Sequence, residues 1–161
     1  MNRPIAVLVS DIHFSLPNLA LATVALTQAI KYANKNSLQL IVTGDLHDTK
    51  ANLRGECTKA MLDTFELAIT KPIVLVGNHD RINEKNPAHA LEFLRNSVRL
   101  IAEPSLIKDF GYMLPYYHDP EELRAYLKTI PKGAIVFMHQ GLQGSNMGDY
   151  IQDKSAINPE D

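Results

Sequence analysis

Four short runs of apolar residues recur along the chain, at residues 5–9, 38–42, 73–76 and 134–138. Each run is rich in Ile and Val and lacks the alternation of apolar and polar positions that marks a half-exposed strand. Runs of this kind are typical of strands that are buried on both faces of a sheet. The pattern therefore predicts four core strands.

Segments with helical spacing of apolar residues lie between these runs. Residues 19–32 follow the start signal Pro17-Asn18, and residues 57–69 and 88–94 show the same spacing. A further helix is expected to open at residues 119–122, where Pro follows Asp and two Glu residues fall in the first turn. Strands that alternate with helices indicate βαβ units, so we expect a layered α/β fold with a mainly parallel sheet flanked by helices.

The remaining apolar stretches are shorter. Residues 98–101, and residues 107–117 with their interruptions at Gly111 and Pro115, are interpreted as strands that begin part of a second sheet. Roughly the last 20 residues show no periodicity and are expected to form a loop or a frayed end. We interpret residues 1–161 as a single domain.

Composition supports a globular protein and excludes several other classes. The chain has 161 residues, of which 45% are hydrophobic and 21% charged, which excludes wholesale disorder and coiled coil. Its single cysteine, Cys57, excludes an intrachain disulfide and a Cys-rich zinc site. The apolar runs are too short to span a bilayer, and no secretory signal pattern opens the chain, so we expect a cytoplasmic location and no membrane partner. The net charge of −2 provides no global positive field for nucleic acid.

Polar residues follow each core strand at the point where the strand is expected to end. In chain order they are Asp11 and His13, then Gly44-Asp45-Leu46-His47-Asp48, then Gly77-Asn78-His79-Asp80, and finally His139. The carboxyl ends of parallel strands meet at one edge of an open α/β sheet, where ligands bind. We therefore expect these side chains to lie together. The glycines at positions 44, 77 and 141 suit sharp turns and close approach of the backbone.

The residue types in this set predict a metal centre. Carboxylate oxygen, imidazole nitrogen and amide oxygen, without thiolate, suit Mn²⁺, Fe²⁺ or Zn²⁺ better than a structural zinc cage. Two such ions about 3.5–4 Å apart can hold the attacking and leaving oxygens of a phosphoryl transfer, and they lower the pKa of a shared water. A carboxylate has to bridge the two ions to screen their repulsion, and Asp45 is the natural bridge.

The four motifs resemble those of the calcineurin-like metallophosphoesterases. The similarity runs from residue 5 to about residue 141. It implies that Asp11 and His13 bind a first ion, that Asp45 bridges, and that Asn78 and His139 bind a second. Mn²⁺ is the expected metal, with Fe²⁺, Zn²⁺ and Mg²⁺ as alternatives. The similarity also implies two catalytic residues, of which His79 is not a ligand but protonates the leaving oxygen or steadies the phosphate. Asp48, the other, is expected to accept a hydrogen bond from His79 and raise its basicity.

Other segments indicate a subfamily. Protein phosphatases of this superfamily continue the second motif as Asp-Arg-Gly, whereas Thr49-Lys50 follow Asp48 here. Residues 114–117 (Leu-Pro-Tyr-Tyr), residues 119–122 and residues 131–133 are similar to DNA-repair nucleases of the SbcD type. This similarity implies a phosphodiesterase that acts on DNA. Nucleases of this type pair with an ATPase subunit and often form dimers, so a homodimer and an ATPase partner are also expected.

The final family motif, Gly-His-x-His, is not present. The six histidines are at 13, 47, 79, 89, 118 and 139, so each metal would lack one imidazole. We expect the chain to be an N-terminal portion of a longer protein; water, Asp149 or Asp153 could fill a vacant position. Two other functions stay open: a phosphomonoesterase or nucleotide phosphodiesterase on the same site, and a non-catalytic interaction module with a degenerate metal site.

The remaining polar residues have weaker signals. His47 is expected to lie behind the ligands or in solvent, His89 on the surface of a helix, and His118 in a structural role. Arg54 and Arg81 lie just beyond the ligand loops. Either could bind a substrate phosphate, with a solvated surface position as the alternative. Cys57 is expected to be buried and has no partner for thiol catalysis.

Overall fold

The centre of the fold is a parallel sheet of four strands, in the order β1-β2-β3-β6. The computed structural model describes residues 4–50, 53–83, 86–147, 150–151 and 157–158. The strands span Ala6–Val9 (β1), Gln39–Val42 (β2), Ile73–Leu75 (β3) and Arg99–Ile101 (β6). Their register pairs Val9 with Val42 and Val42 with Val74. The predicted parallel core sheet is therefore confirmed.

A second sheet of three strands packs beside the first. It is formed by β7 (Ser105–Ile107), β8 (Gly111–Leu114) and β9 (Val136–Met138). β7 and β8 are antiparallel, whereas β8 and β9 are parallel. Two short antiparallel pairs lie outside both sheets: β4 (Arg81–Asn83) with β5 (Asn86–His89), and β10 (Asn146–Met147) with β11 (Tyr150–Ile151).

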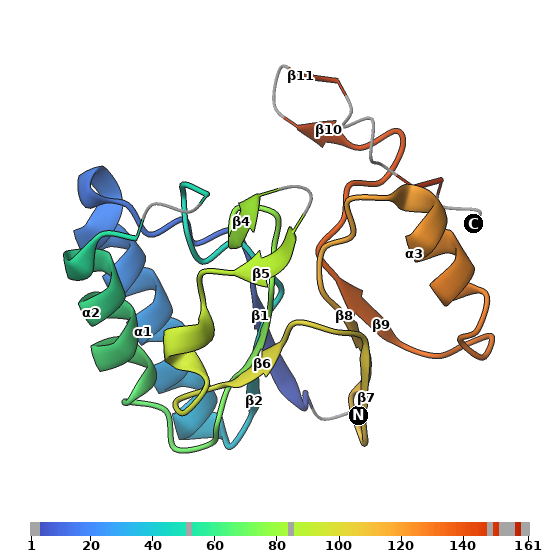
Figure 1. Cartoon of the computed structure of the whole chain (residues 1–161). Helices are drawn as coiled ribbons and strands as arrows, with labels where there is room; N and C mark the ends of the chain where they lie inside the picture. The colour runs from blue at the N-terminus through green and yellow to red at the C-terminus, as the bar shows by residue number, and fades with distance from the viewer. Residues whose placement is uncertain (1–3, 51–52, 84–85, 148–149, 152–156, 159–161) are drawn as a thin grey trace.

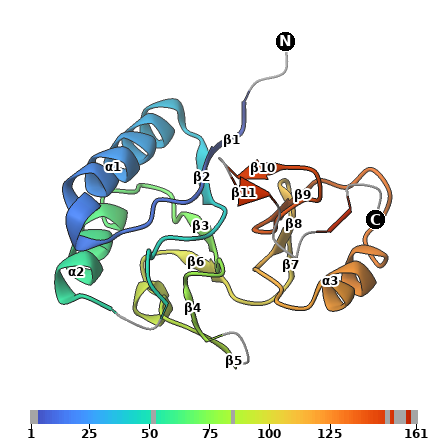
Figure 2. The same cartoon turned by 90° about the horizontal axis from the view of Figure 1, so that it is seen from above.

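The elements form four layers, in the order helices, parallel sheet, second sheet, helix (Figure 1). Helices α1 (Leu19–Asn36) and α2 (Gly55–Phe65) lie on one side of the molecule and α3 (Pro120–Leu127) on the other, which Figure 2 also shows. Short 3₁₀ turns, η1 (Leu16–Asn18) and η2 (Glu92–Leu94), complete the helical segments.

Side-chain alternation along β2 explains this layering. Leu40 and Val42 belong to the core beneath α1 and α2, whereas Ile41 belongs to the core shared with the second sheet. All three are buried, because the strand is covered on both faces. β1 lies at an edge of the sheet and is only partly covered, since Leu8 is 57% exposed. Burial on both faces thus holds for β2 and β3 but not for β1.

The ends of the helices follow from local chemistry. Ser37 ends α1 in a left-handed conformation, and its backbone N–H donates to the last turn of the helix. Asp119 caps α3: its Oδ1 accepts a hydrogen bond from the backbone N of Glu121 at 2.9 Å, and Pro120 occupies the first turn. The predicted start of this helix is confirmed.

Several predicted elements are wrong in detail. The run at residues 134–138 forms β9 in the second sheet, and residues 98–101 supply the fourth parallel strand instead. An apolar run shows that a strand is buried, but not against which neighbour. The helix predicted at residues 88–94 is the end of β5 followed by η2, and the helix predicted at residues 57–69 begins earlier and ends at Phe65. The C-terminal segment is not only loop, because it includes β10 and β11.

No helix in the described part of the chain is long and apolar enough to cross a membrane.

The packing between the two sheets is testable at Ile41, which is fully buried in the shared core. Ile41→Ala should lower the free energy of unfolding by about 2–5 kcal/mol, because it leaves a cavity that the sheets cannot close. Urea unfolding measures the change. The control is Leu106→Ala, since Leu106 is 60% exposed on β7 and its loss should change stability by no more than about 0.5 kcal/mol. Equal effects of the two substitutions would contradict the layered core.

Candidate metal centre

The loops that leave β1 and β2 continue side by side beyond the sheet. Backbone N–H groups of Asp11, His13 and Phe14 donate to the carbonyls of residues 44, 45 and 46 at 3.2, 3.1 and 2.6 Å. Phe14 and His47 also form an isolated parallel β-bridge. The parallel pairing of the strands is thus extended by several residues, which fixes the first two ligand loops relative to each other.

Three candidate ligands lie in a strained backbone conformation. Asp11, His13 and Asp45 have φ angles of 55°, 50° and 52°, in the left-handed region that non-glycine residues rarely adopt. Such residues cost roughly 1–3 kcal/mol each and are found mainly where function requires them. The extended pairing of the two loops holds these residues in place.

The third loop, which follows β3, packs tightly on Asp45. The backbone N of His79 donates to Asp45 Oδ1 at 2.9 Å. A Cβ added to Gly77 would overlap both Oδ1 and the backbone N of Asp45, so only glycine allows this approach. Gly44 has a similar role, because an added Cβ would lie 2.6 Å from His139 Nδ1, and its φ is +112°.

Asp80 joins the loop that follows β2 to the loop that follows β3. Its carboxylate is fully buried and accepts hydrogen bonds from the backbone N atoms of His47 and Gly77, both at 2.9 Å. Burial raises the pKa of Asp80 to about 6, although these two hydrogen bonds oppose the shift. No role is predicted for Asp80 from the sequence. The signal that could have found it is its place as the last residue of Gly77-Asn78-His79-Asp80.

Three histidines share one arrangement of their rings. Each places Nδ1 on a backbone carbonyl: His13 on His47 O at 3.2 Å, His79 on Asp48 O at 2.6 Å, and His139 on Thr43 O at 2.8 Å. A carbonyl only accepts, so Nδ1 carries the hydrogen and the lone pair of the neutral ring is at Nε2. Histidine ligands of metals are oriented in this way, with the second ring nitrogen donating to a carbonyl or carboxylate.

The Nε2 atoms of two of these rings face acidic and amide oxygens. His139 Nε2 lies 2.9 Å from Asn78 Oδ1 and 3.4 Å from Asp45 Oδ2. His13 Nε2 lies 3.7 Å from Asp11 Oδ1 and 3.9 Å from Asp45 Oδ2. Lone pairs that face each other at these distances repel unless a proton or a cation lies between them.

The contact between His139 and Asp45 also shifts the pKa values of both side chains. Burial alone would lower the pKa of His139, but the contact with Asp45 outweighs burial and raises it. Burial would likewise raise the pKa of Asp45, yet the contacts with His139 and His79 hold it below its usual value. The centre therefore favours a positive charge between these side chains, which a divalent ion supplies.

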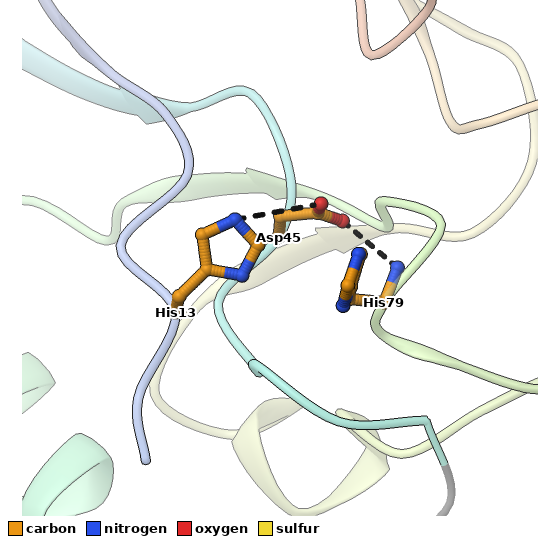
Figure 3. A group of neighbouring side chains, drawn as sticks. All are labelled: His13, Asp45 and His79. Atoms are coloured by element: carbon orange, nitrogen blue, oxygen red, sulfur yellow. Dashed lines mark hydrogen bonds and ion pairs between the residues drawn. The ribbon is translucent and has the colours of Figure 1, made fainter. Parts of the chain in front are cut away.

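Two groups of side chains could each hold an ion. One is His13, Asp45 and His79, drawn in Figure 3, and the other is Asp11, Asp45 and His139. Within each group the ligand atoms lie within 4.8 Å of one another. Asp45 belongs to both groups and is 3% exposed. Imidazole nitrogen and carboxylate oxygen in this arrangement fit a divalent transition metal.

Comparison with known proteins agrees with this chemistry. A family model described as calcineurin-like phosphoesterase matches residues 6–159. The chain belongs to this family. No curated protein matches the chain. As a calcineurin-like phosphoesterase, the protein is a hydrolase of phosphoester bonds that depends on metal ions, and the side chains described above are candidate ligands for them.

The phosphoesterase fold brings together all the side chains that the sequence predicted as ligands: Asp11, His13, Asp45, Asn78 and His139. Their grouping differs in two respects. Asp11 is grouped with Asp45 and His139 instead of with His13, and His79 lies close enough to His13 and Asp45 to act as a ligand itself. Its ring meets that of His13 edge-on, with centroids 5.0 Å apart. Asp149 and Asp153, expected as possible substitutes for a missing ligand, lie outside the described residues.

The pairing of His79 with the Asp48 side chain is not found. His79 Nδ1 meets the backbone carbonyl of Asp48, while the Asp48 carboxylate lies 3.8 Å from His13 Nδ1. The backbone reaches His79 because the second loop turns at this point. Asp48 thus orients His79 through its main chain.

His89 is predicted on the surface of a helix, and His47 behind the ligands or in solvent; the structure covers the side chains of both. His89 lies on β5 instead of a helix, and its side chain is only 8% exposed. His47 is 2% exposed and lies behind the ligands, where its backbone contacts both His13 and Asp80. Burial lowers the pKa of His47 to about 4, so its ring is neutral at physiological pH.

The two arginines differ in their surroundings. Arg54 is exposed at the start of α2. Arg81 is half-buried, hydrogen-bonds the carbonyl of Tyr116, and lies 5.9 Å from the centre of the Tyr116 ring. Cys57 is buried, as predicted.

The close packing at Gly77 is testable by substitution. Gly77→Ala should displace Asp45 and weaken binding of Mn²⁺ by about 10–100-fold, the range found for groups that orient metal ligands. Isothermal titration calorimetry measures the affinity. The matched control is Gly55→Ala, because a Cβ at Gly55 meets nothing within 4 Å and the residue starts α2. Unchanged affinity in the Gly77 variant would show that Asp45 does not bind the ion.

Proposed function

We propose that the protein is a two-ion phosphodiesterase that acts on DNA. The observation that carries the proposal is the position of Asp45, which is shared by two groups of potential ligands. The choice of DNA is supported by the similarity of residues 114–117 to SbcD-type nucleases. Tyr116 of this segment lies beside the centre, because its ring is 6.4 Å from that of His139 and its backbone N–H donates to Val76 O at 2.8 Å.

In this proposal Asp11 and His13 would hold one ion, Asn78 and His139 would hold the other, and Asp45 would serve as a ligand to both. Bound divalent ions, with Mn²⁺ the expected species, supply Lewis acidity and make water nucleophilic near neutral pH. The protein supplies the orientation: the carbonyls of His47 and Thr43 hold the two imidazoles with Nε2 turned towards the centre. Asp45 is held in turn by the backbone of His79.

His79 provides the proton for the leaving oxygen. Because Nδ1 donates to the Asp48 carbonyl, a protonated ring carries its transferable proton on Nε2. Transfer of that proton neutralises the alkoxide as the phosphorus–oxygen bond breaks. An alcohol such as the 3′-oxygen of DNA needs this proton, whereas a nitrophenolate leaves without it.

The number of ions tests the shared role of Asp45. Titration of the wild-type protein with Mn²⁺ should give two ions per chain by calorimetry. Asp45→Asn should lose both, because the substitution removes charge from both groups at once. Asp63→Asn is the control, since Asp63 is exposed and pairs with Lys59 outside the centre. An Asp45 variant that retains both ions would refute the bridging role.

The leaving group tests the role of His79. His79→Ala should slow cleavage of DNA by about 10²–10⁴-fold, the usual contribution of a general acid. Cleavage of bis(4-nitrophenyl) phosphate should fall much less, because its leaving group is a weak base. Steady-state rates on both substrates measure the difference, with the exposed His118→Ala as control. Equal losses on both substrates would instead assign His79 to ion or phosphate binding.

The substrate itself is tested with the wild-type protein and Mn²⁺ on linear duplex DNA, single-stranded DNA and the chromogenic diester. Cleavage of DNA supports the proposal. Turnover of small esters without cleavage of DNA would favour a phosphomonoesterase or nucleotide phosphodiesterase. Absence of both turnover and metal binding would favour a non-catalytic interaction module.

A further inference from the structure

A hollow of about 360 Å³ lies beside the metal centre, between the loop that precedes α1 and the start of α2. It is lined by the apolar residues Phe14, Leu16 and Pro17 and by the polar residues His47, Asp48 and Arg54, among others. Leu16 is 45% exposed and marks the open side. The volume is at the lower end of the range for small-molecule sites, so it suits one compact group and not an extended chain.

Asp48 connects this hollow directly to the reacting groups. Its backbone carbonyl accepts the hydrogen bond from His79 Nδ1, and its carboxylate lies 3.8 Å from His13 Nδ1, while the same residue lines the hollow. A substrate whose phosphate lies at the metal centre therefore has its next group within reach of the hollow. The hollow is an extension of the site and not a separate surface feature.

The lining favours a neutral group over a second phosphate. The guanidinium of Arg54 is accompanied by the carboxylate of Asp48, so the hollow has no excess positive charge for an anion. It instead combines apolar residues with a donor at Arg54 and an acceptor at Asp48. Among the lining residues, His47 has a buried Nε2 atom with no hydrogen-bond partner among the described residues. A flat heterocycle with donors and acceptors on its edge matches all of these features.

We propose that this hollow binds the nucleobase attached to the scissile phosphodiester. The proposal rests on the phosphodiesterase function proposed above and adds a specificity determinant to it. Leu16 and Pro17 pack against the face of the base, and Arg54 and Asp48 provide a donor and an acceptor for its edge. Cleavage therefore favours nucleotide diesters over diesters that lack a base.

Two diesters with the same leaving group test this directly: thymidine 5′-(4-nitrophenyl) phosphate and methyl 4-nitrophenyl phosphate. The wild-type protein should cleave the thymidine ester with the higher kcat/KM. Leu16→Trp, which fills the hollow, should lower the ratio of the two kcat/KM values by about ten-fold, within the range for loss of base stacking. The fall in this ratio should come from a higher KM for the thymidine ester. Arg54→Gln should lower the same ratio and provides a second variant if the first does not fold.

The matched control is Leu106→Trp, which makes the same substitution at an exposed position on β7 and should leave the ratio unchanged. The natural chain has no tryptophan, so the introduced residue alone fluoresces as indole. Blue-shifted emission in the Leu16 variant, but not in the Leu106 variant, shows that the hollow is filled. An unchanged ratio in a variant whose hollow is filled would overturn the proposal.

A binding measurement separates the two proposals. Saturation-transfer NMR of thymidine 5′-monophosphate with metal-free protein should show contact at the base protons, and Leu16→Trp should remove it. Base contact without turnover of any ester would support base binding in the hollow and refute the phosphodiesterase function. Turnover of both esters at equal kcat/KM, without base contact, would support the phosphodiesterase function and refute base binding in the hollow.

Discussion

The structure depends on one electrostatic constraint: lone pairs of imidazole, carboxylate and amide groups converge at distances where they repel one another unless a positive charge lies between them. His139 Nε2 faces Asn78 Oδ1 at 2.9 Å and Asp45 Oδ2 at 3.4 Å, with its other nitrogen already donating to Thr43 O. Water would separate such groups in a flexible chain. A rigid scaffold has to keep them together, and most unusual features of the fold serve this purpose.

The scaffold does so by backbone contacts instead of by side-chain packing. Left-handed φ angles at Asp11, His13 and Asp45 are tolerated because backbone hydrogen bonds join the loops after β1 and β2. Asp80 ties the second loop to the third through two backbone N–H groups. Backbone atoms move less than long side chains, so a site anchored in this way loses little entropy when an ion binds.

The sequence was sufficient to predict the parallel sheet, its flanking helices and the convergence of the ligands, because each depends on local patterns. Apolar runs mark the strands, and polar residues at their carboxyl ends mark the site. What it could not predict depends on tertiary contacts. The place of β9 in the second sheet, the use of the Asp48 carbonyl instead of its carboxylate, and the burial of His89 all follow from which elements happen to pack together. The role of Asp80 belongs to the same class, because only the structure shows what its carboxylate contacts.

Because β9 belongs to the second sheet, the metal centre draws its candidate ligands from both sheets. His139 comes from the second sheet, whereas the other candidate ligands come from loops of the first. Tyr116 helps to fix the two sheets at this point, through its backbone contact with Val76 and its hydrogen bond from Arg81. Any ion held by Asp45 and His139 therefore also joins the two sheets. Arg81 takes part in this junction, because its guanidinium hydrogen-bonds the carbonyl of Tyr116 and lies 5.9 Å from the centre of the Tyr116 ring.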